Sequence, residues 1–224
     1  MHSFVARLAG CLTLLAPLGA VAQTNQIQNG SFEATALGAD NYCYIGPACA
    51  IPGWSNSSAA LLISSDSLAW GNPSGLGNWN SATYGGVVAG LQNQAALEQS
   101  VNLTAGSYVL SWSDAGRRSF SDQTYLVSLV SADHSSGTLL GSYATAPGQA
   151  WQSHALTVNV ATTGSYALRL SGQQTADGTA FVDHFSLTSA VPEPNSAALL
   201  LTGLAGLAGL GSVRRRTSHL KDGV

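Results

Sequence analysis

The sequence is poor in charged residues, cysteine and methionine. Charged residues make up 8% of its 224 positions, and there are three cysteines and one methionine. An ordinary soluble protein contains about 25% charged residues. Between residues 23 and 190 there is no lysine, and three arginines stand against nine acidic residues. This part of the chain therefore has no basic patch, which argues against nucleic-acid binding.

Patterns of catalytic residues are also lacking. A glycosidase needs two carboxylates across a cleft, whereas the nine acidic residues are scattered and no pair stands out. No Gly-x-Ser-x-Gly motif occurs in a strand–turn–helix context. The histidines at 134, 154 and 184 do not have metal-ligand spacing. We therefore expect a protein that is not an enzyme and requires no cofactor.

The N-terminus predicts export. Arg7 precedes an apolar stretch, and Ala20-Val21-Ala22 satisfies the small-x-small rule for cleavage. Residues 1–22 are therefore predicted to be a signal peptide that signal peptidase removes. An uncleaved anchor is the alternative, although the stretch is short for a membrane span. A lipoprotein box at Leu8-Ala9-Gly10-Cys11 is a second alternative, but it precedes most of the apolar region instead of following it.

The C-terminus predicts a membrane helix. Residues 197–213 carry no charge, and these 17 residues span about 25 Å as a helix. The arginines at 214–216 form the only basic cluster of the chain and should stay in the cytoplasm. Residues 217–224 are then a cytoplasmic tail, and residues 23–190 lie outside the cytoplasm.

The order of features near the C-terminus resembles a known sorting signal. Pro192-Glu193-Pro194 is followed by the apolar helix and then by Arg214, Arg215 and Arg216. Over residues 191–216 this resembles the PEP-CTERM signal of bacterial exported proteins. The resemblance implies processing by an exosortase at the inner membrane. It further implies a final place on the cell surface or in the extracellular matrix, in association with exopolysaccharide. A plain C-terminal anchor is the alternative.

The middle of the chain, residues 23–190, has the length of one domain and reads as β-strands. In residues 108–113, Tyr108, Leu110 and Trp112 alternate with smaller residues and should face a core. In residues 164–172, Tyr166, Leu168 and Leu170 do the same, with Arg169 facing outward. Residues 124–132, 137–144, 151–161 and 178–188 are further strand candidates. No segment has a convincing helical period, so we predict an all-β sandwich.

Several short motifs in this domain resemble the jelly-roll domains of the galactose-binding-like class. They are Asn29-Gly-Ser-Phe-Glu33, Ile51-Pro-Gly-Trp54 and the stretches 97–118, 151–172 and 178–188. That class includes carbohydrate-binding modules and extracellular domains without an assigned role. The resemblance implies a jelly-roll β-sandwich.

The resemblance also implies a possible structural calcium site. In such modules an acid in the opening motif and an acid in the last strand commonly share the ion, which here are Glu33 and Asp183. Period two places Asp183 on one face with Phe181, Phe185 and Leu187, so it should be partly buried. A buried carboxylate needs a partner. The alternative is that Asp183 accepts backbone hydrogen bonds or pairs with an arginine.

Two cysteines remain in the exported part. Cys43 and Cys49 are separated by five residues, and in an exported chain such a pair is expected to form a local disulfide. Metal binding is the alternative, but no histidine lies nearby.

The segment 66–86 carries the candidate ligand site. It is rich in glycine and asparagine, which predicts a long loop, and long loops are often functional. It holds Trp70, Trp79 and Tyr84, whose rings could stack on a sugar, and Asn78 beside them could hydrogen-bond. The alternative is that both tryptophans cover the edge of the sandwich. The rings therefore predict a glycan ligand, and the PEP-CTERM resemblance implies that it is exopolysaccharide. A purely structural matrix protein and a divergent hydrolase are the alternatives.

The adjacent arginines Arg117 and Arg118 follow a predicted strand. Arginine at a strand end can donate hydrogen bonds to a sugar hydroxyl or a carboxylate, or it can hold a loop in place.

Overall fold

The structure is a computed structural model, and it describes residues 23–190 with the exception of residue 58. The predicted signal peptide, sorting motif, membrane helix and cytoplasmic tail lie outside the described residues. Within the part that is described, no helix is long and apolar enough to cross a membrane.

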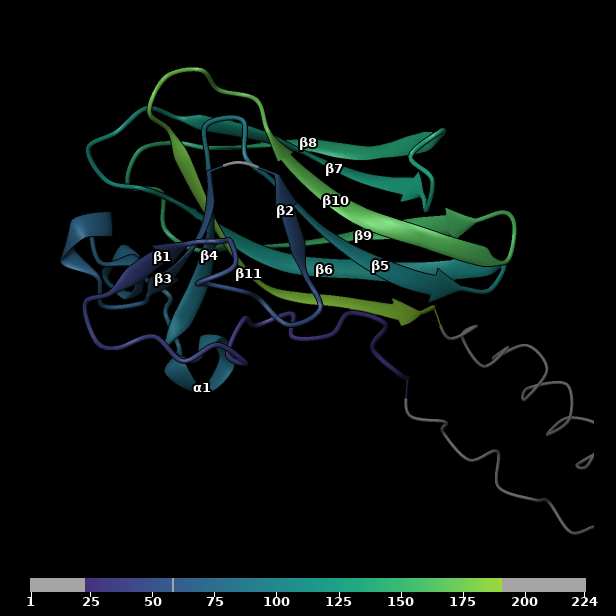
Figure 1. The fold of residues 1–224 in the computed structure, drawn as a ribbon, viewed down its shortest axis with the longest axis horizontal. Coiled ribbons are helices and arrows are strands. Elements are labelled where there is room, and N and C mark those ends of the chain that lie inside the picture. The colour runs from purple at the N-terminus through teal and green to yellow at the C-terminus, as the bar shows by residue number, and fades with distance from the viewer. Residues whose placement is uncertain (1–22, 58, 191–224) are drawn as a thin grey trace, which may run out of the picture.

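The described residues form a sandwich of two antiparallel sheets (Figure 1), which confirms the all-β prediction. The six-stranded sheet contains, in spatial order, β1 (Tyr42–Tyr44), β3 (Ala60–Ser64), β4 (Val87–Gln92), β11 (Thr179–Ser189), β6 (Gly106–Gly116) and β9 (Gln152–Val160). The five-stranded sheet contains β2 (Ser55–Ser57), β5 (Ala96–Leu103), β10 (Gly164–Gly172), β7 (Gln123–Ser131) and β8 (Gly137–Thr145). From β4 to β11 the chain passes repeatedly from one sheet to the other, as in a jelly roll.

The main core lies between the two sheets. Its alternating positions agree with the predicted strands, because Tyr108, Leu110 and Trp112 of β6 are all buried there. From the opposite sheet Leu168 and Leu170 of β10 are buried, and Tyr166 packs against the same cluster. Burial of this apolar surface is the main favourable term in folding.

The long connection between β3 and β4 covers the outer face of the six-stranded sheet. It contains two 3-10 helices, η1 (Leu68–Trp70) and η2 (Pro73–Leu76), and one short helix, α1 (Ser81–Tyr84). Asn72 and Asn80 cap η2 and α1 through their side chains, which explains why a segment without helical periodicity forms helical turns. A second apolar cluster fills the space beneath it, containing Leu61, Ile63, Trp70, Leu76, Val88, Ala115, Trp151 and Phe181.

Strand β11 changes face in its middle, and here the sequence-based prediction is wrong. The register with β6 shifts between Asp183 and Ser186, and His184 has a positive φ of 59°. This β-bulge places one extra residue in the strand. Phe181 therefore lies in the outer cluster, whereas Phe185 and Leu187 lie in the main core. Asp183 lies on the side of Phe181.

The disulfide between Cys43 and Cys49 is confirmed, with Cα atoms 6.1 Å apart. It joins β1, at the edge of the six-stranded sheet, to the turn that follows. Both ends of the described segment lie side by side (Figure 1), since the Gln26 N–H donates to the Leu187 carbonyl at 2.8 Å.

Candidate functional site

Three aromatic rings gather on the outer side of the six-stranded sheet. Trp79 and Tyr84 of the β3–β4 connection lie 5.2 Å apart between ring centroids. Both rest on Trp151, at 5.4 and 5.5 Å. Trp151 is buried, and its Nε1 donates to the Pro73 carbonyl at 3.0 Å. Trp79 and Tyr84 are half-buried, so the buried ring supports two rings that keep part of their surface exposed.

Polar groups surround this ring pair, which we call the Trp79–Tyr84 pair. The Tyr84 hydroxyl lies 3.2 Å from Ser113 Oγ on β6, and Ser113 Oγ lies 3.3 Å from Ser153 Oγ on β9. The exposed ring of His184 lies 5.7 Å from that of Tyr84. Asn78 is exposed and donates to the Trp151 carbonyl at 3.4 Å. Exposed ring surface beside hydroxyl, imidazole and amide groups suits a ligand that is apolar on one face and rich in hydroxyls at its rim.

Trp70 has a different surrounding, and the expectation of an open stacking ring is corrected for it. Its side chain is 3% exposed. The guanidinium carbon of Arg117 lies 3.9 Å from its ring centroid, and Tyr42 packs against it at 5.5 Å. Trp70 therefore covers the sheet, which agrees with the alternative interpretation that it packs on the edge of the sandwich. Arg118 binds the Gly75 carbonyl, so both arginines hold loops in place.

The two predicted calcium ligands lie near the start of β4 and at the bulge in β11, close enough for the charge of Glu33 to act on Asp183. Glu33 Oε1 accepts hydrogen bonds from the N–H groups of Gly86 at 3.0 Å and Val87 at 2.8 Å. Asp183 is 0% exposed, and its Oδ1 accepts from the N–H of His184 at 2.6 Å. Its Oδ2 has no hydrogen-bond partner. Burial raises the pKa of Asp183 well above its usual range, and the negative charge of Glu33 adds to this shift.

The unpartnered oxygen of Asp183 is the one observation here that suits a hard cation. A buried carboxylate oxygen without a partner is costly, and a calcium ion would supply the missing interaction. Among the residues that the structure describes, no group of three or more His, Cys, Asp or Glu side chains could hold a metal. Backbone carbonyls and water would therefore have to complete the coordination of a calcium ion at Glu33 and Asp183.

A buried polar network was not expected from the sequence. Trp112 Nε1 donates to the Tyr125 hydroxyl at 2.8 Å, and this hydroxyl donates to Asp114 Oδ2 at 2.7 Å. His154 Nε2 lies 3.0 Å from Asp114 Oδ1, within ion-pair distance but not aligned for a hydrogen bond. Burial and the nearby Asp114 raise the pKa of Tyr125 far above its ordinary value. The network lies between the sheets, where hydrogen-bonded polar groups make a core more rigid.

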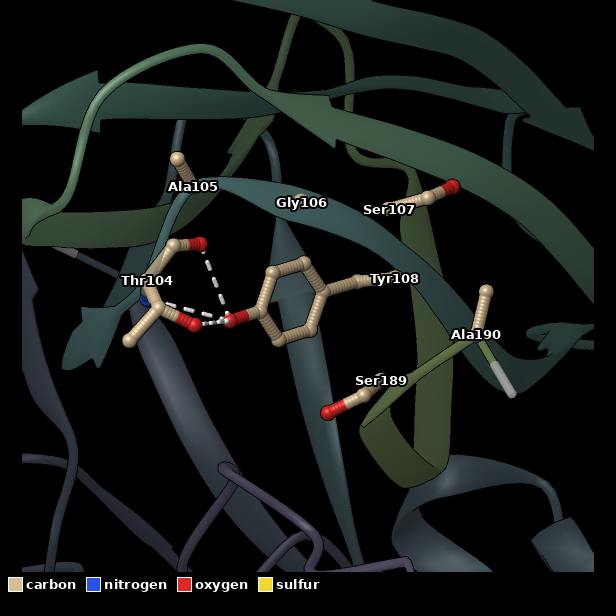
Figure 2. Close-up of a pocket in the computed structure, with 7 residues that line it drawn as sticks. All are labelled: Thr104, Ala105, Gly106, Ser107, Tyr108, Ser189 and Ala190. Carbon is tan, nitrogen blue, oxygen red and sulfur yellow. Dashed lines mark hydrogen bonds between the residues drawn. The ribbon is translucent and has the colours of Figure 1, made fainter. Parts of the chain in front are cut away.

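A hollow of about 420 Å³ lies where β11 ends (Figure 2). The Tyr108 hydroxyl is held there by Thr104, at 3.0 Å from both its N and Oγ1 and 3.1 Å from its carbonyl. Tyr108 is itself buried, and the other lining residues are small, namely Ala105, Gly106, Ser107, Ser189 and Ala190. No charged side chain lines this hollow, and its one aromatic ring is engaged in packing.

No protein-family model and no curated protein matches this sequence. Solved structures with a similar fold include TmCBM61 in complex with β-1,4-galactotriose, at 18% identity and a TM-score of 0.49, covering 75% of this chain and 99% of that one. The xylan-binding domain of a Paenibacillus barcinonensis protein has 9% identity and a TM-score of 0.45, covering 62% and 88%. A family 35 carbohydrate-binding module from Clostridium thermocellum has 17% identity and a TM-score of 0.41, covering 61% and 92%. These are distant resemblances of fold, and function has to be argued from the residues of this chain.

Proposed function

We propose that this protein is an exported, non-catalytic polysaccharide-binding protein. The supporting observation is the Trp79–Tyr84 pair, two half-buried rings on a buried support of Trp151. A pyranose presents C–H groups on its ring faces, which stack on aromatic rings, and hydroxyls at its rim. The exposed side chains of Asn78 and His184 supply hydrogen-bonding groups beside the rings.

The ring pair is held in place before any ligand binds. Tyr84 is fixed by its contact with Ser113, and the backbone around it by α1 and its cap at Asn80. Side chains that are already ordered lose less conformational entropy on binding, so their contacts contribute more to affinity.

Calcium has a supporting role in this proposal. Glu33 accepts hydrogen bonds from the N–H groups of Gly86 and Val87, where the loop that carries Tyr84 joins β4. A calcium ion at Glu33 and Asp183 would neutralise two carboxylates and tie this loop end to β11. The ion would therefore stabilise the support of the site, without contacting the sugar.

Export and sorting rest on the sequence signals at both ends. In this proposal signal peptidase releases the leader, and an exosortase processes the PEP-CTERM segment at 191–216. The domain then reaches the cell surface or the extracellular matrix. The disulfide Cys43–Cys49 suits such an oxidising location.

The test is co-sedimentation of the full chain, purified after export, with polysaccharide. The probes are exopolysaccharide of the source organism, xylan and β-1,4-galactan, the last two because compared modules bind such glycans. We expect the Trp79→Ala/Tyr84→Ala variant to lose affinity by about fivefold per ring, from about 1 kcal/mol for each stacking contact.

The matched control is Leu139→Ala, which removes an exposed apolar side chain, 59% accessible, from the other sheet. The control should bind as the wild type does. Equal binding by the wild type and the double variant would place the site elsewhere, and no binding to any probe would contradict the proposed function.

A further inference from the structure

A second aromatic surface lies at the edge of the six-stranded sheet. Its exposed side chains are Tyr42 at 41%, Tyr44 at 51%, Leu68 at 74% and Phe120 at 38%. They come from β1, from η1 and from the loop between β6 and β7. We call this group the edge surface. Among the described residues, no aromatic ring of the edge surface packs against the ring of Trp79 or Tyr84.

The two tyrosines are exposed because of the register of β1. Tyr42 lies opposite Ile63 and Tyr44 opposite Leu61, so both point to the outer face of the sheet. Cys43 between them points to the main core and is bound to Cys49. The disulfide therefore anchors a three-residue edge strand that presents two rings to solvent.

A buried arginine holds the surface together. The guanidinium carbon of Arg117 lies 3.9 Å from the centroid of Trp70 and 3.5 Å from that of Phe120. Trp70 packs against Tyr42 at 5.5 Å, and Tyr42 against Tyr44 at 6.3 Å. The groups thus form one continuous row with a buried middle and exposed ends, and cation–π contacts strengthen its centre.

A polar chain connects the Tyr44 end of the row to Arg117 in its middle. The Tyr44 hydroxyl donates to Gln92 Oε1 at 2.9 Å, and Gln92 Nε2 donates to Asp177 Oδ1 at 3.0 Å. Asp177 lies 3.6 Å from Arg117 and its side chain is half exposed. Exposed ring faces thus lie next to an exposed carboxylate and an amide, which bind hydroxyl groups well.

A hollow adjoins the other end of this row. Its volume is about 480 Å³, within the range of about 300–1,000 Å³ that is usual for ligand pockets. Phe120 and Leu68 supply apolar walls, and Arg118 and Asn72 supply polar ones. One sugar ring fits a volume of this size.

We infer that the edge surface is a second polysaccharide-binding site, separate from the Trp79–Tyr84 pair. The ligand class rests on the proposed function, whereas the location rests on the contacts just described. A protein partner fits less well, because stable protein interfaces bury about 800 Å² on each partner, and here carboxylate, amide and guanidinium groups interrupt four apolar side chains. Two sites on one chain would bind a polymer through both at once and therefore more tightly than a short oligosaccharide.

The experiment is affinity electrophoresis of the exported full chain in gels that contain exopolysaccharide or soluble β-glucan. The variants are Tyr44→Ala, Trp79→Ala and their combination, with Tyr44→Phe to keep the ring and Leu139→Ala as the control. We expect Tyr44→Ala to weaken retardation by about fivefold, and Tyr44→Phe to retain most of it. The double variant should lose more than either single variant.

The outcomes separate the two sites. Weakening by Trp79→Ala but not by Tyr44→Ala would overturn the edge surface and leave the proposed function standing. Weakening by Tyr44→Ala but not by Trp79→Ala would support the edge surface and contradict the first site. A wild type that neither polymer retards would overturn both, since each claims a polysaccharide ligand.

Discussion

Asp183→Asn should stabilise the protein without calcium and remove its response to calcium. In the native structure Asp183 is buried with one oxygen unpartnered, and burial raises its pKa well above the usual range. In the unfolded chain the pKa of an aspartate is about 3.9. As the pH rises above that value, the unfolded chain loses this proton first, so the free energy of unfolding falls until the native pKa is passed.

The substitution removes this loss because asparagine carries no charge. Its carbonyl can still accept from the His184 N–H, and a neutral amide loses less than a carboxylate when it is buried without a partner. An unsatisfied buried polar group costs about 1–3 kcal/mol. A gain of about 2 kcal/mol corresponds to about 4–8 °C in melting temperature for a domain of this size. The wild type should also lose stability from acidic to neutral pH more steeply than the variant.

The assay is calorimetric melting of both proteins, in a chelator and in excess calcium. Calcium at about one hundred times its dissociation constant stabilises a folded protein by about 2.7 kcal/mol. The order of melting temperatures should therefore reverse, with the variant higher in chelator and the wild type higher in calcium. Asp122→Asn, at an exposed position, serves as the control. Equal calcium responses of wild type and Asp183→Asn, or a variant that melts lower in chelator, would refute the reasoning.

Two further predictions concern the fold. In Gly116→Ala the added Cβ would overlap the carbonyl oxygen of Ala146, and we expect a loss of about 2 kcal/mol or more in the free energy of unfolding by urea, whereas Gly38→Ala, in open space, should change it little. Tyr125→Phe should flatten the loss of stability at alkaline pH. The pKa of Tyr125 is raised by burial and by Asp114, so its contribution is present below about pH 10 and is lost as the pH rises further. If the melting temperatures of both proteins fall equally steeply as the pH rises above about 10, the prediction is wrong.

The strands of the sandwich could be predicted because their periodicity agrees with their burial. β10, for example, alternates buried Leu168 and Leu170 with Arg169, which pairs with Glu98 on the opposite face at 2.9 Å. The bulge at His184 could not be predicted, because it depends on how β11 pairs with its neighbours. A shift of one residue moves the side chains on the two sides of the bulge to opposite faces. Asp183 is buried as predicted, but it and Phe181 do not share a face with Phe185 and Leu187.

The candidate sites also depend on contacts between distant segments, which the sequence pattern does not reveal. Segment 66–86 was correctly predicted as a long loop, but its composition does not reveal which ring is covered. Trp70 is buried because Arg117, almost fifty positions later, stacks on it. The edge surface was missed because its rings belong to a three-residue strand and two separate loops. Only the register of β1 with β3 indicates that Tyr42 and Tyr44 share an exposed face.

The central claim is that polysaccharide binds on the Trp79–Tyr84 pair, and tryptophan fluorescence tests it most directly. The chain has five tryptophans, and Trp79 is the only one that is not buried. Emission that iodide can quench therefore comes mainly from Trp79. The account predicts that saturating polysaccharide protects the emission of Trp79 from quenching by iodide in the wild type. Polymer that co-sediments with the protein but leaves iodide quenching unchanged would contradict it.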